Sequence, residues 1–402
     1  MSESLLASRL SPSLVTGGPF HALMRQLRML DADDLPSGRA AWLLGAIAWL
    51  VGAALATLQS TLTGDARLLA YFLDASPAAH ALVAMPVMIG IERFADRQLL
   101  SLLAHPIEHG LVPDGGEPAW RDAVALADRR SGSAFAEATL LAIAISACLA
   151  LAYTGQVGTD PWSRPGGAAD ASLTWAGAWT HVAVGALFLF LVLRWLLRFF
   201  VWTLLLARLA WMPLRLVASH PDRAAGLGFM AAYPTLFLGL VLGVGTALGA
   251  KLLNAALYGS AAAEDLATVL AMWVAVVLVV FVGPVLLFAP RLAAFRNEAL
   301  LEFGALGMRA NRGVLEATQA ALATGEPQAA VLDGASADML RKLSALNALN
   351  ALHDRVNAIQ PLLVTRATLM QLVVFALLPM LPALATQMPL SRLIDLLLGG
   401  FA

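Results

Sequence analysis

Long stretches without a charged side chain are the feature that most constrains this chain. Six windows lack Asp, Glu, Lys and Arg altogether: residues 40–64, 138–159, 171–193, 224–250, 266–290 and 367–391. A helix needs about 20 mostly apolar residues to cross the hydrocarbon core of a bilayer. One charge at its centre costs about 2.5–3.5 kcal/mol on insertion scales. Each window therefore predicts a transmembrane helix.

A seventh, shorter stretch at 75–91 contains Pro77, His80 and Pro86, and the distribution of basic residues decides how it is interpreted. Cytoplasmic loops of membrane proteins are enriched in Lys and Arg. If 75–91 is a span, 22 of the 26 basic residues fall on one side, in segments 1–39, 92–137, 194–223 and 291–366. We therefore expect seven spans in a bacterial inner membrane, with the N-terminus cytoplasmic and the C-terminus outside.

Composition agrees with an all-α, polytopic membrane protein with a helical cytoplasmic portion. Apolar residues make up 59% and charged residues 13%, where soluble domains carry roughly a quarter charged. The net charge of −1 gives no field that would attract nucleic acid. We expect four regions: a cytoplasmic segment with an amphipathic helix at 1–39, six transmembrane helices within 40–290, a cytoplasmic helical hairpin at 291–366, and the last transmembrane helix with a short outside tail at 367–402. Cytoplasmic helices are expected at 92–137 and 194–223.

The hairpin is predicted from a leucine stripe. A helix beginning after Ser336 places apolar residues at steps of three or four, namely Leu340, Leu343, Leu346, Leu349, Leu352, Val356 and Ile359. Its simplest partner is the preceding helix, 296–325, in an antiparallel pair. Residues 336–360 are also the predicted contact for a cytoplasmic protein.

Arginines after the fourth span form the first candidate functional face. Arg194, Arg198, Arg208 and Arg215 project to one side of a continuous helix at 100° per residue. One interpretation is an interfacial helix with arginines at lipid headgroups. The other is a vestibule that concentrates anions at a pore mouth. A neighbouring segment, 219–229, adds His220, Asp222 and Arg223, which suit either a ligand site or a structural joint.

Small residues predict how the fifth span packs. Gly239 and Gly243 form one pair four residues apart, and Gly245 and Gly249 form another. Such pairs let helix backbones approach closely in lipid. The two pairs face different directions, so we expect two neighbouring helices. In the outside loop 154–175, Trp162 is predicted to be an interfacial anchor.

No motif predicts a catalytic, metal or cofactor site, and an enzyme is the less favoured interpretation. His105, Glu108 and His109 match the H-x-x-E-H zinc spacing, but Pro106 interrupts the helix that the motif needs. A phosphate-binding G-x-x-x-x-G-K-[ST] loop is absent from the sequence. The charge-free windows contain no carboxylate, and Glu92 and Glu137 are expected at cytoplasmic helix ends, so a coupled transporter is disfavoured.

Three functions remain open. The first is an oligomeric channel with an arginine-lined cytoplasmic mouth. The second is a membrane scaffold or regulatory subunit that docks a protein through 336–360. The third is a lipid-acting enzyme, which would require His220, Asp222 and Arg223 to meet Arg194 or Arg198 around one cavity. The expected partners are the lipid bilayer, further copies of the chain and a cytoplasmic protein, without nucleic acid.

Overall fold

The computed structural model describes residues 17–31, 35–164, 172–258, 263–323 and 337–386. Among these residues every long element is a helix, and seven helical segments are long and apolar enough to cross a membrane. They are Gly38–Thr63, Ala75–Glu108, Glu117–Tyr153, Trp175–Trp211, Gly228–Tyr258, Leu266–Glu316 and Arg366–Ala385. The predicted all-α fold with seven spans is confirmed, and each predicted window overlaps one segment; residues 171 and 387–391 of the windows lie outside the described part of the chain.

Only the first of the seven segments is a single uninterrupted helix, α3 (Gly38–Thr63), whose N-cap Ser37 accepts a hydrogen bond from the Ala40 amide. The other six are jointed. Their parts are α4 (Ala75–Ala78), η2 (Ala79–Ala84), α5 (Met85–Gly90) and α6 (Glu92–Glu108); α7 (Glu117–Ser131) and α8 (Ala134–Tyr153); α9 (Trp175–Ala178), η4 (Trp179–Val184) and α10 (Gly185–Trp211); η5 (Gly228–Phe237) and α11 (Leu238–Tyr258); α12 (Ala263–Val282), η6 (Gly283–Phe288) and α13 (Ala289–Ala323); and α16 (Arg366–Leu377), η7 (Leu378–Met380) and α17 (Leu381–Ala385).

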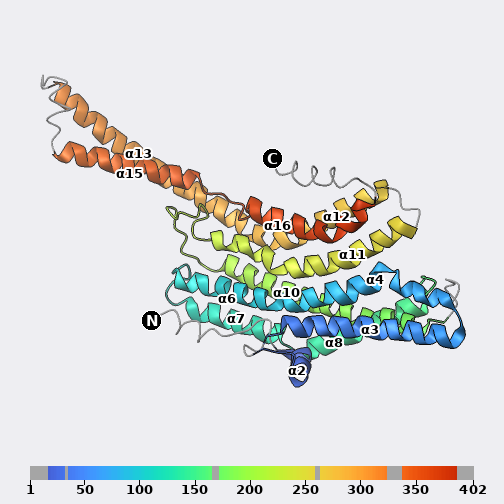
Figure 1. The fold of residues 1–402 in the computed structure, drawn as a ribbon. Helices are drawn as coiled ribbons and strands as arrows, with labels where there is room; N and C mark the ends of the chain where they lie inside the picture. The colour runs from blue at the N-terminus through green and yellow to red at the C-terminus, as the bar shows by residue number, and fades with distance from the viewer. Residues whose placement is uncertain (1–16, 32–34, 165–171, 259–262, 324–336, 387–402) are drawn as a thin grey trace.

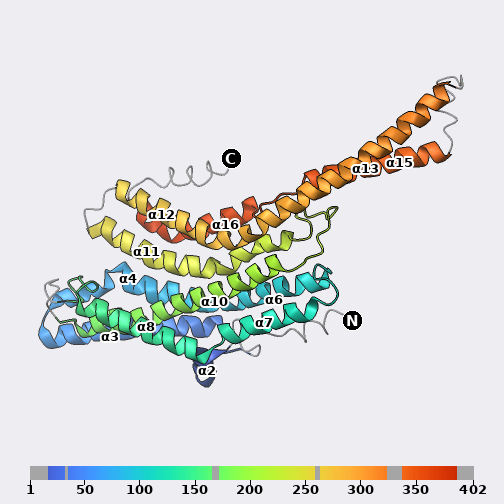
Figure 2. The ribbon, with the colours of Figure 1, turned by 180° about the vertical axis from the view of Figure 1, so that it is seen from behind.

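The spans stack side by side with their axes roughly aligned (Figures 1 and 2). The helices α3, α7 and α8 lie on one side, α4–α6 and α10 in the middle, and α11, α12 and α16 on the other side. We call the end from which α13 and α15 (Ala337–Asn357) project the hairpin end. The opposite end, where α3 finishes and α4 begins, is called the histidine end because His80 and His181 lie near it.

The segments predicted as separate cytoplasmic helices continue the spans directly. The helix α6 follows α5 after a single turn at Ile91, and α10 runs without a break from Gly185 to Trp211. The irregular parts are the turns at 109–116 and 132–133 and the segment 212–227. With Phe237 and Phe281 of the fifth and sixth spans, these extensions continue the main hydrophobic core toward the hairpin end. There Phe237 contacts the rings of Trp202, Phe199 and Phe281 at centroid distances of 5.6, 5.0 and 5.4 Å.

The long helices α13 and α15 pair antiparallel and extend away from the bundle (Figure 1). At the base, Arg296 donates to the Asn357 carbonyl at 3.0 Å and to Asn357 Oδ1 at 2.8 Å. On α15, Leu346, Leu349 and Leu352 are half-buried, whereas Val356 and Ile359 are fully buried where the hairpin meets the bundle. The stripe therefore turns toward α13 from Leu346 onward, whereas Leu343 is exposed and the side chain of Leu340 lies outside the described residues.

Glycines in α11 let it approach two neighbours. A Cβ at Gly239 would lie 2.1 Å from Ile91 Cγ2, whereas one at Gly249 would lie 2.3 Å from the Pro379 carbonyl oxygen. The two glycine pairs thus face α4–α6 on one side and the last span on the other. The last span is broken at η7, where Pro379 lies. Helix breaks of this kind free carbonyl groups, and the bare Gly249 backbone leaves room for that of Pro379.

We predict that Gly249→Ala destabilises the folded protein by about 1–3 kcal/mol, because the added methyl meets a backbone oxygen that cannot rotate away. The matched control is Gly90→Ala, where a Cβ meets nothing within 4 Å. Unfolding in mixed detergent micelles, followed by circular dichroism, measures both variants. Equal stabilities for the two would contradict the close approach of α11 to η7.

Candidate functional site

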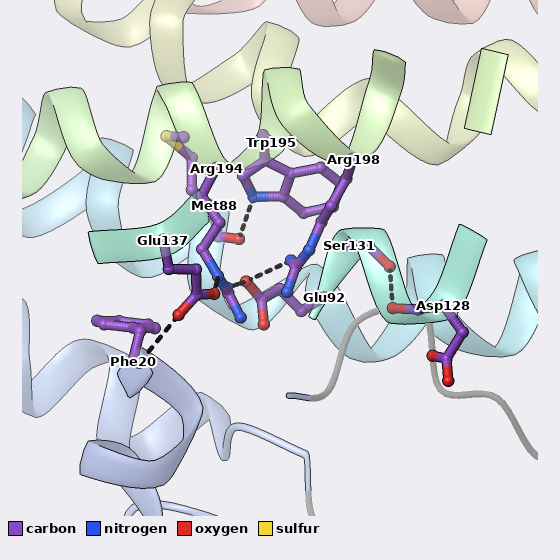
Figure 3. A network of polar contacts seen from close by, with 9 residues as sticks. All are labelled: Phe20, Met88, Glu92, Asp128, Ser131, Glu137, Arg194, Trp195 and Arg198. Atoms are coloured by element: carbon purple, nitrogen blue, oxygen red, sulfur yellow. Dashed lines mark hydrogen bonds and ion pairs between the residues drawn. The ribbon is translucent and has the colours of Figure 1, made fainter. Parts of the chain in front are cut away.

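Two sites stand out in the bundle, and the first is a buried cluster of four charges, the Arg–Glu cluster, made of Glu92, Glu137, Arg194 and Arg198. These residues are 1%, 2%, 2% and 1% exposed. Arg194 donates through Nε to Glu137 Oε1 at 2.7 Å and through Nη1 to Glu92 Oε1. Arg198, one turn later on α10, donates to the same Glu92 oxygen at 2.9 Å (Figure 3). Two positive and two negative charges compensate each other.

The N-terminal helix α2 (Gly18–Gln26) closes the cluster from the side. The Phe20 amide donates to Glu137 Oε2 at 3.0 Å, and the Arg194 guanidinium lies 5.1 Å from the centre of the Phe20 ring (Figure 3). Between the two arginines, Trp195 donates its indole N–H to the Met88 carbonyl at 3.0 Å. The cluster therefore joins α2, α6, α8 and α10.

The cluster changes how the arginine face is understood. Arg194 and Arg198 are buried and paired, so they are not available to attract anions at a pore mouth. Arg208 instead lines a surface groove between α7 and α10, and Arg215 lies beyond the helix, where it forms an exposed ion pair with Asp114 at 3.1 Å. The structure thus divides the predicted face among three environments.

The 219–229 segment forms a tight loop organised by Asp222. Its carboxylate accepts hydrogen bonds from the amides of Ala224 (2.9 Å), Gly226 (3.2 Å) and Gly228 (2.8 Å). Burial works to raise the pKa of Asp222, but these amides and His220 outweigh it, so the pKa lies below its ordinary value. Arg223 adopts a left-handed conformation with φ 57° and its carbonyl accepts from the Gln360 amide. The contacts of Asp222 are those of a structural joint.

The second site is a cavity of about 390 Å³ at the histidine end, which we call the histidine cavity. Two π-helical turns form its walls, η2 in the second span and η4 in the fourth. The π-helix is rare and occurs frequently at functional sites. The lining comprises Ser76, Pro77, His80, Cys148, Gln156, Val157, Gly158, Thr159, Asp160, Thr180, His181, Val184, Gly185, Lys251 and Asn254.

Each π-helical turn contributes one histidine to the histidine cavity. His80 Nδ1 lies 2.7 Å from the Ser76 carbonyl oxygen and donates to it, and its ring meets Phe188 edge-on at 4.9 Å. His181 stacks on Trp162 at 5.4 Å. Its Nε2 is buried without a hydrogen-bond partner among the described residues. Buried polar atoms are normally paired, so this nitrogen is an unsatisfied polar group in the wall of the cavity.

Asp74 fixes the rim of the histidine cavity. One carboxylate oxygen accepts from Asn254 Nδ2 at 2.6 Å, and the other accepts from the Trp162 indole at 2.8 Å. These bonds connect α4, α11 and the loop after α8. Trp162, predicted as an interfacial anchor, is 2% exposed and lies edge-on to Tyr71 at 5.0 Å. The prediction was wrong because the aromatic and polar atoms of Trp162 all find partners inside the protein.

The histidine cavity combines acidic and basic groups. Burial, and to a lesser extent the Asp74 carboxylate, raises the pKa of Asp160 above its ordinary value. Lys251 supplies a positive charge on the opposite helix. Because Gln156, Thr159 and Lys251 are exposed, the cavity communicates with the surroundings of the histidine end. Its inner part is lined by Cys148, the single cysteine of the chain.

His105, Glu108 and His109 lie in the last turn of α6 and just after it, with Pro106 inside the helix. The two imidazole rings stack at 3.8 Å, and His105 also packs on Phe229 at 4.1 Å. Across the parts of the chain that the structure describes, no three His, Cys, Asp or Glu side chains are placed to hold a metal ion.

Comparison with known protein families, with characterised proteins and with solved structures found no match to this chain. Functional interpretation therefore depends on the geometry of the two sites.

Sequence reasoning identified part of each site. It named Arg194 and Arg198 without their carboxylate partners, because Glu92 and Glu137 flank the charge-free windows and were placed at helix ends. Their depth along the helices could have indicated the pairing. At 1.5 Å per residue, Glu92, Glu137 and Arg194 all lie about 24–29 Å from the histidine end of their spans. Nothing in the sequence indicated the two π-helical turns that bring His80 and His181 to one cavity.

We predict that Glu92→Gln destabilises the protein by about 3 kcal/mol or more, since it leaves a buried positive charge without its partner. Combining it with Arg198→Met restores the charge balance and should recover part of that loss. Glu117→Gln is the control, because Glu117 and Arg121 form an exposed pair and such pairs contribute about 1 kcal/mol or less. Chemical unfolding in micelles measures all three; an equal loss at Glu117 and Glu92 would count against a buried, mutually compensated cluster.

Proposed function

We propose that the protein is a membrane-embedded binding protein, a receptor or carrier, that takes a small polar solute in the histidine cavity. The observation that carries this proposal is a cavity of about 390 Å³ walled by two π-helical turns, with the unpartnered His181 Nε2 in its wall. Ligand pockets commonly measure about 300–1,000 Å³ and contain a few placed polar groups. Asp160 and Lys251 give the cavity both an acidic and a basic group, which suits a solute that carries both charges.

The segment between the two sites favours a binding protein over a permanently open pore. Gly185 lines the inner part of the histidine cavity, and Arg194 begins the Arg–Glu cluster about 14 Å further along α10. Phe190 and Leu191 lie between them and are 3% and 1% exposed. A polar path through one copy would have to cross this apolar layer, so conduction would require rearrangement or assembly of several copies.

The orientation proposed for the protein follows from its basic residues. With 22 of 26 basic residues in the segments predicted to lie inside, the hairpin among them, the positive-inside rule supports a cytoplasmic hairpin end in a bacterial inner membrane. The histidine cavity would then face the periplasm and receive solutes from outside.

The unique cysteine provides the test. We expect a charged, water-soluble methanethiosulfonate to label Cys148 in the folded protein, because the histidine cavity admits water. In the Cys148→Ser background, Leu149→Cys is the control: Leu149 is 51% exposed on the outer surface of α8, where lipid suppresses the reactive thiolate, so labelling should be at least about tenfold slower. Mass spectrometry of the intact protein measures both rates. Cys148 that reacts only after unfolding would contradict an aqueous cavity.

The same readout identifies the solute. Small zwitterionic metabolites, amino acids first, should protect Cys148 saturably. His181→Phe keeps a ring against Trp162 but removes Nε2, and should weaken protection about tenfold, the effect of one well-placed hydrogen bond. His109→Phe, at the other end of the bundle, should leave protection unchanged. If no zwitterionic compound protects, or if both variants behave alike, the proposed binding function fails.

A second function, docking of a protein at the hairpin end, is favoured by one observation on α13. Leu301, Met308 and Leu315 are 77%, 69% and 57% exposed. Their spacing of seven residues puts them on one stripe of the helix, away from α15. An apolar stripe with heptad spacing fits an amphipathic helix of a partner. The proposed contact therefore moves from Leu346, Leu349 and Leu352 of α15, which are half-buried, to α13 itself.

We predict that a photo-crosslinking amino acid at Met308 captures a second protein in living cells. Leu301→Asp with Leu315→Asp should lower the yield at least about tenfold, since charges interrupt the apolar stripe. The same crosslinker at Glu302, on another face of α13, is the control. A product containing two copies of this chain would assign the stripe to self-association, and equal yields at Met308 and Glu302 would remove the docking proposal.

A further inference from the structure

A surface groove of about 820 Å³ runs between α7 and α10 on the hairpin side of the Arg–Glu cluster. Three of its lining residues are arginines, Arg129 and Arg130 in the last turn of α7 and Arg208 in the last turn of α10. All three are exposed. The groove also contains the carboxylate of Asp122, so its lining side chains carry a net positive charge.

These arginines are available to a ligand. None of the three forms an ion pair with a carboxylate in the described part of the chain, whereas Arg121 and Arg215 nearby are paired with Glu117 and Asp114. Arg129 does lie close enough to Asp128 to interact electrostatically. Guanidinium groups present a planar fork of N–H donors that matches the oxygens of a phosphate group.

An exposed apolar strip leads from the bundle to the arginines. On α10, Leu196, Phe200, Leu204 and Trp211 are 40%, 60%, 39% and 88% exposed. With Arg208 they follow steps of three and four residues, so all five lie on one face of the helix. A soluble phosphate compound has no apolar part that would cover this strip, whereas the acyl chains of a lipid would lie along it. Tryptophan is also enriched where membrane proteins meet headgroups.

We propose that the groove binds the phosphate headgroup of an anionic phospholipid, with Arg129, Arg130 and Arg208 on the phosphate, the acyl chains along Leu204, Phe200 and Leu196, and Trp211 beside the headgroup. The inference is independent of the histidine cavity. Anionic lipids gather in the cytoplasmic leaflet, which is where the basic-residue count puts the hairpin end.

The test uses the full-length protein in detergent, titrated with phosphatidylglycerol or with phosphatidylcholine of the same acyl chains and followed by native mass spectrometry. We expect preferential binding of phosphatidylglycerol. The triple variant Arg129→Gln, Arg130→Gln, Arg208→Gln should weaken phosphatidylglycerol binding at least about tenfold and leave phosphatidylcholine unchanged. The matched control, Arg309→Gln, Arg312→Gln, Arg341→Gln, removes the same charge from the hairpin and should bind like the parent protein.

Further variants and a competition experiment distinguish a lipid headgroup from free inorganic phosphate as the ligand of the groove. Trp211→Ala should weaken phosphatidylglycerol about threefold or more without affecting inorganic phosphate, because it removes only the apolar contact. If the triple variant does not fold, Arg208→Gln and Arg129→Gln alone should each reduce binding measurably. The proposal is overturned if phosphatidylglycerol and phosphatidylcholine bind equally, if the glutamine variants bind like the control, or if millimolar inorganic phosphate displaces the lipid completely.

Discussion

The pairing of Arg194 and Arg198 with Glu92 and Glu137 is the interaction on which the rest of the structure depends. Four charges are withdrawn from solvent, and each finds an opposite charge within hydrogen-bonding distance. Buried ion pairs are costly to form and much costlier to break, because a lone charge is left in an apolar medium. Since the four side chains come from three different spans, their mutual neutralisation fixes the register of those spans.

The two ends of the bundle build on that fixed register in different ways. Toward the histidine end, α10 continues through apolar residues to η4, and the second span continues through α5 to η2, so two spans bring their π-helical turns to the same cavity. Toward the hairpin end, α6 and α10 extend into an aromatic core, and Arg291 donates to the carbonyls of Ala210 and Met212 to attach α13 to the end of α10. The histidine cavity and the protruding hairpin therefore belong to one continuous set of helices.

The sequence allowed the spans to be predicted because lipid imposes one strong rule, the absence of unpaired charge over about 20 residues. It also allowed the small residues of α11 to be recognised, since Gly239 and Gly249 follow a spacing with a known packing meaning. It did not reveal the histidine cavity. A π-helical turn arises where one extra residue is accommodated by its neighbours, and the residues around His80 and His181 carry no local signature of that event. The pairing of Glu92 with Arg194 was likewise hidden, because it joins residues 102 positions apart.

The order of the charges along the chain has a consequence for how the protein is made. Glu92 and Glu137 are synthesised before Arg194 and Arg198, so the second and third spans must be delivered to the membrane while their carboxylates still lack counter-charges. The fourth span brings both arginines at once and completes the neutral cluster. Until then the carboxylates are most stable at the membrane–water interface, and each helix can reach it by sliding outward by a turn. Biogenesis of this bundle thus has a commitment point at the fourth span, after which the earlier helices can no longer slip back.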